Sequence, residues 1–212
     1  MEQEGYVFMS VARRLKRPGI PKTPPKEIDD RDLIALIRES QFWGRHCKRN
    51  YGLLLFLADT GVRVGGLVSL RVGDLDLLHG EAMVCEKGGK YRSVFFGRRT
   101  ASALLAWFVE RGRDPGSVFG LTAQGVRMVL RRLKKAAGVT GRVNPHSFRH
   151  AFAKRSIVAG ADISFVSAMM GHSDIKVTKD AYLIFRTEEL RVAHAKYSSI
   201  DAGSNSIGEV SV

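Results

Sequence analysis

The stretch NPHSFRH, residues 144–150, holds two histidines and an arginine, side chains that can ligate a metal, exchange protons or bind an anion. His146 and His150 are one helical turn apart, which is the spacing of zinc-binding H-x-x-x-H helices. Two features disfavour zinc. Ser147 stands where such helices carry a glutamate as general base, and Arg149 would bring a fixed positive charge toward the cation. We therefore expect no metal here.

The same stretch suits an anion such as phosphate. Asn144 is a good helix N-cap, Pro145 fits the first helical position, and the free N–H groups of a first helical turn point toward bound anions. His146 and Arg149 share one helix face, so one can exchange a proton while the other donates two hydrogen bonds to phosphate oxygens. The alternative is a capped helix with a surface histidine and a paired arginine.

Composition favours a globular protein with a polyanionic partner. The chain has 212 residues, 44% of them hydrophobic, and a net charge of +13. Such a charge favours nucleic acid, because phosphates neutralised by Lys and Arg supply affinity that does not depend on sequence. The alternative is a soluble protein that happens to be basic.

Cysteine usage and hydropathy bear on location. Cys47 and Cys85 are far apart and match neither a zinc ribbon nor a disulfide framework. This cysteine usage fits a protein of the reducing cytoplasm. No apolar run is long enough for a membrane span or a signal peptide. We expect a cytoplasmic protein without a membrane segment.

Charge and proline divide the chain into three parts. Residues 1–28 are basic and proline-rich and predict an arm or linker, residues 29–197 predict the compact domain, and residues 198–212 predict a flexible polar tail.

Within the domain, helical periodicity and end signals predict mainly helices. We expect a first helix capped by Asp29 or Asp30, and a second over roughly 48–60 that ends at Gly61 and turns Tyr51, Leu54, Leu55 and Ala58 to the core. Further helices are expected over about 64–70, over 100–111, from Thr122, from Asn144, and between Asp162 and Gly171. Gly88-Gly89 joins two β-prone runs into a hairpin.

The helix after Thr122 carries a basic stripe. Arg127, Arg131 and Lys135 are spaced on one face. Such runs of charged residues often form a solvated helix face. In a basic protein with an anion-binding motif nearby, the more specific alternative is a helix that faces DNA. Lys90, in the hairpin, is a further candidate for DNA binding.

Five places form an ordered set: Arg63 in TGVRVGGLVSL, Lys87 in EKGGKYR, His146 and Arg149 in HSFRH, His172 in MMGHSDI, and Tyr182 in TKDAYLIF. In this order and context they resemble the catalytic signature of the tyrosine recombinase, or phage integrase, family. The resemblance implies an α+β fold, a mainly α-helical catalytic domain with a small antiparallel β-sheet.

The resemblance also implies site-specific DNA cleavage and rejoining through a 3′-phosphotyrosine link. Tyr182 would be the nucleophile, and Tyr91 and Tyr197 are its rivals. Deprotonating a tyrosine at pH 7 costs about 4 kcal/mol, which a nearby base or cations must offset.

The other signature residues have roles in the family. Arg63 and Arg149 would bind the nonbridging oxygens, His146 would accept a proton, His172 would donate to the phosphate, and Lys87 would protonate the leaving 5′ oxygen. Because these groups do what magnesium does elsewhere, we expect no metal or other cofactor.

The chain departs from the family pattern at the first arginine. The family often has a glutamate three residues later, where this chain has Gly66, so support for Arg63 is missing or supplied elsewhere. The interval from His172 to Tyr182 is also one residue longer than expected.

The resemblance implies double-stranded DNA as partner and a homotetramer on two DNA sites. Full-length members usually carry an N-terminal helical domain, whereas this chain has room for a basic arm. We therefore expect either a separately produced catalytic domain or a minimal recombinase. The rivals are a type IB topoisomerase, which would relax DNA without a partner site, and a weakened DNA-binding module, which would never become covalently attached to DNA.

Overall fold

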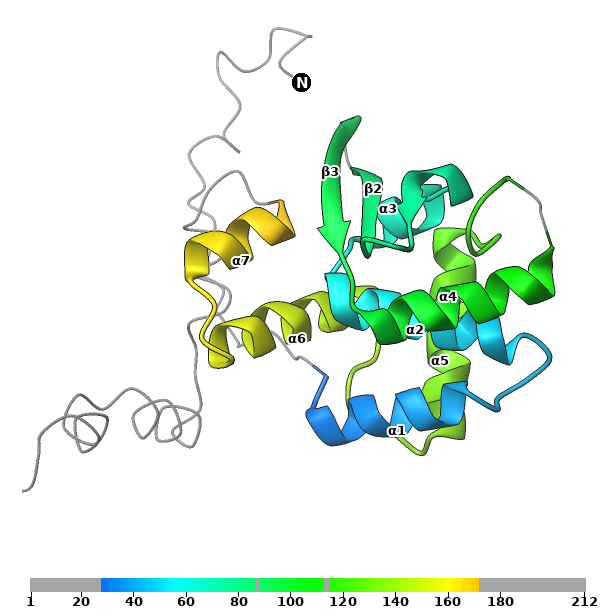
Figure 1. Ribbon diagram of the computed structural model, residues 1–212. Helices are drawn as coiled ribbons and strands as arrows, with labels where there is room; N and C mark the ends of the chain where they lie inside the picture. Colours follow the sequence, from blue (N-terminus) through cyan, green and yellow to red (C-terminus); the bar gives the residue numbers. More distant parts are fainter. Residues whose placement is uncertain (1–27, 87, 113–114, 172–212) are drawn as a thin grey trace, which may run out of the picture.

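The computed structural model describes residues 28–86, 88–112 and 115–171, and confirms a mainly helical α+β fold with a small antiparallel sheet (Figure 1). The helices are α1 (Asp30–Ser40), α2 (Cys47–Thr60), α3 (Val64–Ser69), α4 (Arg98–Arg111), α5 (Ala123–Ala136), α6 (Pro145–Val158) and α7 (Ile163–Met170), with a short 3-10 helix, η2 (Val72–Asp74). The strands are β1 (Leu75–Asp76), β2 (Glu81–Glu86) and β3 (Lys90–Phe95).

Helix α2 lies at the centre of the fold, in contact with α1, α4 and α6. Of the four residues predicted to face the core, Leu54 and Leu55 are buried, whereas Tyr51 and Ala58 are only half-buried. Leu53, Phe56 and Leu57, outside the predicted set, are fully buried as well. A helix enclosed by neighbours buries residues around its whole circumference, so no single apolar stripe marks its core face.

Local signals set most helix ends. The side chains of Asp29, Thr122, Asn144 and Asp162 each accept a hydrogen bond from a backbone N–H in the first turn of the helix that follows. Short polar side chains at the N-cap satisfy amide groups that would otherwise lack a helical partner. The predicted N-terminal ends of these four helices are confirmed.

The sheet has the order β1-β2-β3, and both pairs are antiparallel. Glu86, the last residue of β2, pairs with Lys90, the first of β3. Gly88 and Gly89 have φ of 83° and 71° in the turn between them, the left-handed region that tight hairpins need and glycine adopts without strain. The hairpin is confirmed, whereas the short strand β1 was not predicted.

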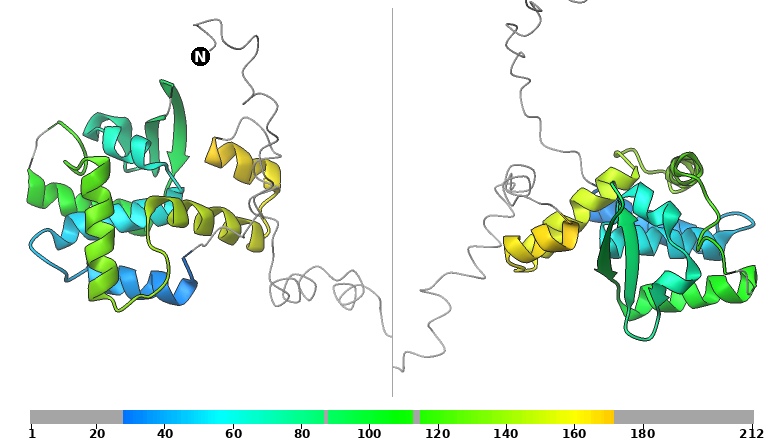
Figure 2. Two further views of the ribbon diagram at one scale, coloured as in Figure 1. Left: turned by 180° about the vertical axis from the view of Figure 1, so that it is seen from behind. Right: turned by 90° about the horizontal axis from the view of Figure 1, so that it is seen from above.

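The surrounding helices bring distant parts of the chain together. Helix α5 packs against α1 and α3, and it stands upright across the molecule when seen from behind (Figure 2). Helix α7 packs on α6 and lies beside the hairpin (Figure 1). None of the helices in the described ranges combines the length and apolarity needed to cross a bilayer. The predicted arm, apart from Ile28, and the tail lie outside the described residues.

Candidate active site

Arg63 stands at the beginning of α3, in the short link from α2. Gly61 ends α2 with φ of 58°, and the Thr60 hydroxyl accepts a hydrogen bond from the Val62 N–H. These contacts set the direction in which Arg63 leaves the core. The Arg63 side chain is 40% exposed, and its Nη1 donates to Glu86 Oε2.

Glu86 joins two arginines at the end of β2. Its Oε2 accepts from Arg63, and its Oε1 accepts from Arg92 Nη2 at 3.0 Å. The Glu86 side chain is 7% exposed. Burial alone would raise the pKa of this carboxyl, but the hydrogen bond and charge of Arg92, with the charges of Arg63 and Arg149, lower it below its usual value. Glu86 is therefore ionised at neutral pH.

Arg149 is buried, with 3% of its surface exposed. Its Nη1 donates to the Gly61 carbonyl oxygen at 2.8 Å, and its Nη2 donates to that of Met170. Gly61 caps the C-terminal end of α2, and Met170 is the last residue of α7. Helix C-termini present carbonyl oxygens and the negative end of the helix dipole, so they stabilise a buried guanidinium.

The first turn of α6 fixes His146. Asn144 accepts from the Ser147 N–H at 2.9 Å, the Ser147 hydroxyl accepts from the Asn144 N–H at 2.9 Å, and Pro145 occupies the first turn. This reciprocal capping holds the start of the helix rigidly. His146 is exposed there while Phe148 and Arg149 turn inward.

His146 contacts His150 through their Nε2 atoms, which are 2.8 Å apart, with the rings at 81° to each other. The sequence places His150 one helical turn after His146, and the structure brings the two rings into contact. Two nitrogens sharing a tetrahedral zinc ion would be about 3.3 Å apart, so this distance describes a direct hydrogen bond. In the described part of the chain, no three His, Cys, Asp or Glu side chains are grouped for a metal.

His146 also lies in a positive environment. Although the residue is exposed overall, partial burial of its ring lowers the pKa of His146, and the charges of Arg149, Arg142 and Arg63 lower it further. The imidazole is therefore neutral at pH 7, the state in which a ring nitrogen can accept a proton.

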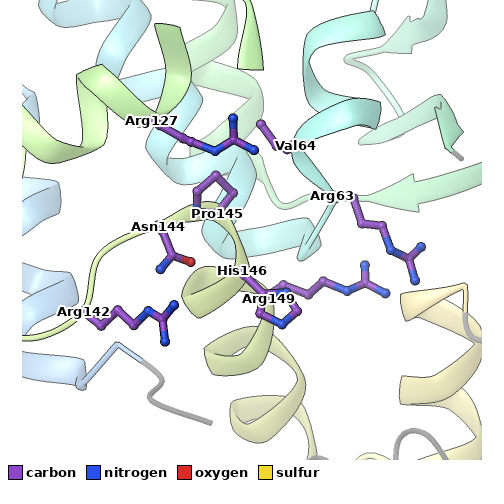
Figure 3. A pocket seen from close by; sticks show the side chains of 8 residues that line it. All are labelled: Arg63, Val64, Arg127, Arg142, Asn144, Pro145, His146 and Arg149. Atoms are coloured by element: carbon purple, nitrogen blue, oxygen red, sulfur yellow. The ribbon is translucent and has the colours of Figure 1, made fainter. Parts of the chain in front are cut away.

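A cavity of about 460 Å³ joins these groups (Figure 3). Side chains from three regions line it: the start of α3, helix α5, and the first turns of α6 with the loop before them. Its lining residues are Arg63, Val64, Arg127, Arg142, Asn144, Pro145, His146 and Arg149. Four arginines and a histidine around one hollow make a site for an anion of phosphate size or larger.

The other predicted site residues fall into two groups. Arg131, Lys135 and Lys90 are exposed and do not line this cavity, whereas Arg127 does. Lys87, His172 and Tyr182 lie outside the described residues, as does Tyr197. The rival Tyr91 is 70% exposed on β3.

Sequence reasoning missed Glu86, Arg92 and Arg142. Glu86 is 23 residues from Arg63 along the chain, and no local pattern links the two. Arg142 stands two residues before the N-cap Asn144, and that position near a predicted anion-binding helix start was a usable signal.

The arrangement suits phosphoryl transfer. Arginine guanidiniums carry a permanent charge and fork toward nonbridging oxygens, so they stabilise the charge that develops on a phosphorus centre. A neutral histidine beside them can take a proton from an attacking hydroxyl.

Comparisons with known proteins identify relatives of this chain. The model of the phage integrase family matches residues 27–188. The tyrosine recombinase XerD of Mycobacterium leprae is 35% identical over 210 residues, which cover 89% of this chain and 66% of XerD. The tyrosine recombinase XerC of Oceanobacillus iheyensis is 30% identical over 211 residues, which cover 92% of this chain and 68% of XerC.

Solved structures share the fold. The XerA recombinase superposes with a TM-score of 0.72 at 26% identity, covering 84% of this chain and 66% of XerA. A post-cleavage complex of XerH with a palindromic difH substrate superposes with a TM-score of 0.71 at 21% identity, covering 85% of this chain and 55% of XerH. The chain thus spans about two thirds of the length of the curated relatives named above. With the family model covering most of its length, the chain belongs to the phage integrase family of tyrosine recombinases.

Proposed function

We propose that this chain carries out the chemical steps of a site-specific DNA recombinase, cleaving and rejoining strands through a 3′-phosphotyrosine intermediate. One observation carries the proposal: Arg63, His146 and Arg149, which come from segments more than 80 residues apart, line one cavity with the charge and size for a phosphodiester. Family membership supports it, because the relatives are tyrosine recombinases.

The proposed reaction exchanges one phosphodiester for another. The Tyr182 oxygen attacks the scissile phosphorus, the bond from phosphorus to the 5′ oxygen breaks, and a 3′-phosphotyrosyl bond forms. His146 takes the phenol proton, and Lys87 gives a proton to the leaving 5′ oxygen. A 5′-hydroxyl from a second strand then attacks the phosphotyrosine and reverses these transfers, so no phosphate bond is hydrolysed.

In this proposal Arg63 and Arg149 hold the two nonbridging oxygens, and His172 donates a third hydrogen bond. The guanidiniums stabilise the phosphorane most strongly, because its charge is greater than that of the ground-state diester. The burial of Arg149 between two helix ends supports this role, since a fixed group needs no rearrangement as the charge develops.

The proposed partner is double-stranded DNA. The net charge of +13 and the exposed stripe of Arg131 and Lys135 beyond the cavity support it, as do solved relatives in complex with DNA. We further propose a homotetramer on two DNA sites, the assembly that strand exchange between two duplexes requires.

A covalent trapping experiment tests the proposal. The chain is incubated with a pool of nicked duplexes that carry a randomised segment, the mixture is denatured, and protein-linked DNA is recovered and sequenced. Loss of the short fragment beyond the nick traps the phosphotyrosine. We expect adducts enriched in one sequence from the native chain, and none from Tyr182→Phe.

The products separate the rivals. Joining of strands from two different duplexes supports recombination, whereas relaxation of a plasmid without recombinant products would indicate a topoisomerase. Salt-sensitive binding to the pool with no adduct would contradict the catalytic proposal and favour a DNA-binding module.

A further inference from the structure

Glu86 is the acidic residue that bonds Arg63 at the cavity, and the proposed reaction gives it no role. Its two oxygens bind arginines from different elements: Arg63 at the start of α3 and Arg92 within β3. A carboxylate that is 7% exposed and ionised must offset a large desolvation cost, and the paired guanidiniums do so. Such an arrangement fixes the direction of both arginines.

We propose that Glu86 is a positioning residue that holds the Arg63 guanidinium ready for the scissile phosphate. This inference rests on the proposed function. Arg63 is 40% exposed, and a long exposed side chain samples many rotamers unless a partner restrains it. One bond from Nη1 to Glu86 orients the planar group while leaving its remaining N–H donors for phosphate oxygens.

The local packing explains why the carboxylate comes from β2. A residue three positions after Arg63 could supply it from α3, but that position is Gly66, which is buried. A Cβ at Gly66 would lie 3.1 Å from Val62 Cγ2 and 3.5 Å from the Cys85 carbonyl oxygen. The close approach of β2 to α3 at Gly66 therefore places the next strand residue, Glu86, against Arg63.

The far side of Glu86 is anchored as well. Arg92 is 15% exposed, and its Nη1 donates to the Met169 carbonyl oxygen at 2.5 Å. Gly171 packs on the same side chain, because a Cβ there would lie 2.8 Å from Arg92 Cδ. Glu86 thus ties Arg63 to the end of α7, the same helix end that accepts a hydrogen bond from Arg149.

An opposite role would be shielding, in which Glu86 competes with phosphate for Arg63. The charges argue for positioning, because one carboxylate faces two guanidiniums and the group of three keeps a net positive charge. The two roles predict opposite changes: loss of a positioning group slows cleavage, and loss of a shield speeds it.

The test compares the native chain with Glu86→Gln, which keeps the size of the side chain and removes its charge. The matched control is Glu81→Gln, the same change at the other end of β2. Two quantities are measured: the order parameter of the Arg63 Nε–H by ¹⁵N NMR, assigned with Arg63→Lys, and the single-turnover rate of adduct formation beside the affinity for the same duplex.

We expect the Arg63 order parameter in Glu86→Gln to fall below about 0.6, the range of a flexible group. Cleavage should slow roughly 10- to 100-fold, the usual effect of losing an orienting partner, while DNA affinity stays within about twofold. A purely structural role would lower affinity and rate together. If Glu86→Gln does not fold, Glu86→Asp keeps the buried charge, shortens the side chain, and should show the same changes on a smaller scale.

Four results would overturn the inference: an unchanged Arg63 order parameter, an unchanged cleavage rate, a joint fall in affinity and rate, or faster cleavage, which would indicate shielding. Absence of adducts from the native chain identifies a failure of the proposed function instead. The NMR measurement then still decides whether Glu86 orders Arg63.

Discussion

The hydrogen bond between His146 and His150 decides which nitrogen can accept a proton. When the Nε2 of His150 accepts, His146 carries its proton on Nε2 and keeps a lone pair on Nδ1. In the proposed reaction, that tautomer is the one that can take the phenol proton of Tyr182 through Nδ1. Partial burial and the positive charges of Arg149, Arg142 and Arg63 lower the pKa of His146, so its imidazole is neutral at pH 7, the state that the proposed base requires.

The depressed pKa of His146 predicts the acid limb of the cleavage rate. A base must be neutral, so the rate should be constant above the pKa of His146 and fall below it. Because burial and the arginines lower this pKa from 6.5, the rate should fall to half its plateau value at a pH below 6.5. Single-turnover cleavage measured with saturating DNA at a series of pH values on both sides of 6.5 gives the pH at which the rate falls to half.

Arg142→Gln supplies the paired test. Removing one of the positive charges that lower the pKa of His146 should raise that pKa and move the acid limb to higher pH. Arg132→Gln, an equal charge change at an exposed α5 residue outside the cavity lining, should leave the limb in place. If the cleavage rates of the native protein and of Arg142→Gln fall at the same pH, a group other than His146 governs the loss of activity at low pH.

At the scale of elements, two helix ends meet at the buried Arg149. Gly61 ends α2 and Met170 ends α7, and both present carbonyl oxygens to the guanidinium. Gly61 also lies against α6, because a Cβ there would lie 2.6 Å from Phe152 Cδ1. The end of α2 therefore has to be a glycine for two separate reasons, backbone conformation and space.

Gly61→Ala should destabilise the protein more than backbone strain alone explains. A left-handed φ costs a non-glycine residue roughly 1–2 kcal/mol, and overpacking against an aromatic ring adds about 1–3 kcal/mol. Gly138→Ala is the matched control, since Gly138 has φ of 64° with nothing within 4 Å of an added Cβ. Urea unfolding of the two variants should give a larger loss for Gly61→Ala, and equal losses would contradict the contact with Phe152.

At the scale of the whole molecule, much of the fold could be predicted because its signals are local. Caps such as Asp29 and Asn144 act within one helical turn, and the hairpin glycines act within one turn of chain. The all-round burial of α2 was missed, although the unbroken apolar run Leu53–Leu57 is typical of a helix that neighbours enclose. The bond between Arg63 and Glu86 could not be predicted, because it depends on how closely β2 packs on α3, and the spacing of the two residues in the sequence does not indicate that contact.

The net charge of +13 and the α5 stripe predict how the molecule binds DNA. If Arg131 and Lys135 each contact a phosphate, Arg131→Gln and Lys135→Gln should each reduce the slope of log affinity against log salt by about 0.9. Arg132, next to Arg131 but off the stripe, is the control. Titrations of a mixed-sequence duplex at several salt concentrations measure the slopes. Equal changes in all three variants would mean that general positive charge, and not the stripe, binds DNA.

We propose that the cavity of Arg63, His146 and Arg149 serves attack by Tyr182 on the scissile phosphate. Mass spectrometry of the protein–DNA adduct, digested with protease and nuclease, identifies the modified residue and the DNA end attached to it. We expect a 3′-phosphate on the peptide that contains Tyr182, and a free 5′-hydroxyl on the released strand. A nucleotide on Tyr91 or Tyr197, or a link through a 5′-phosphate, would contradict it.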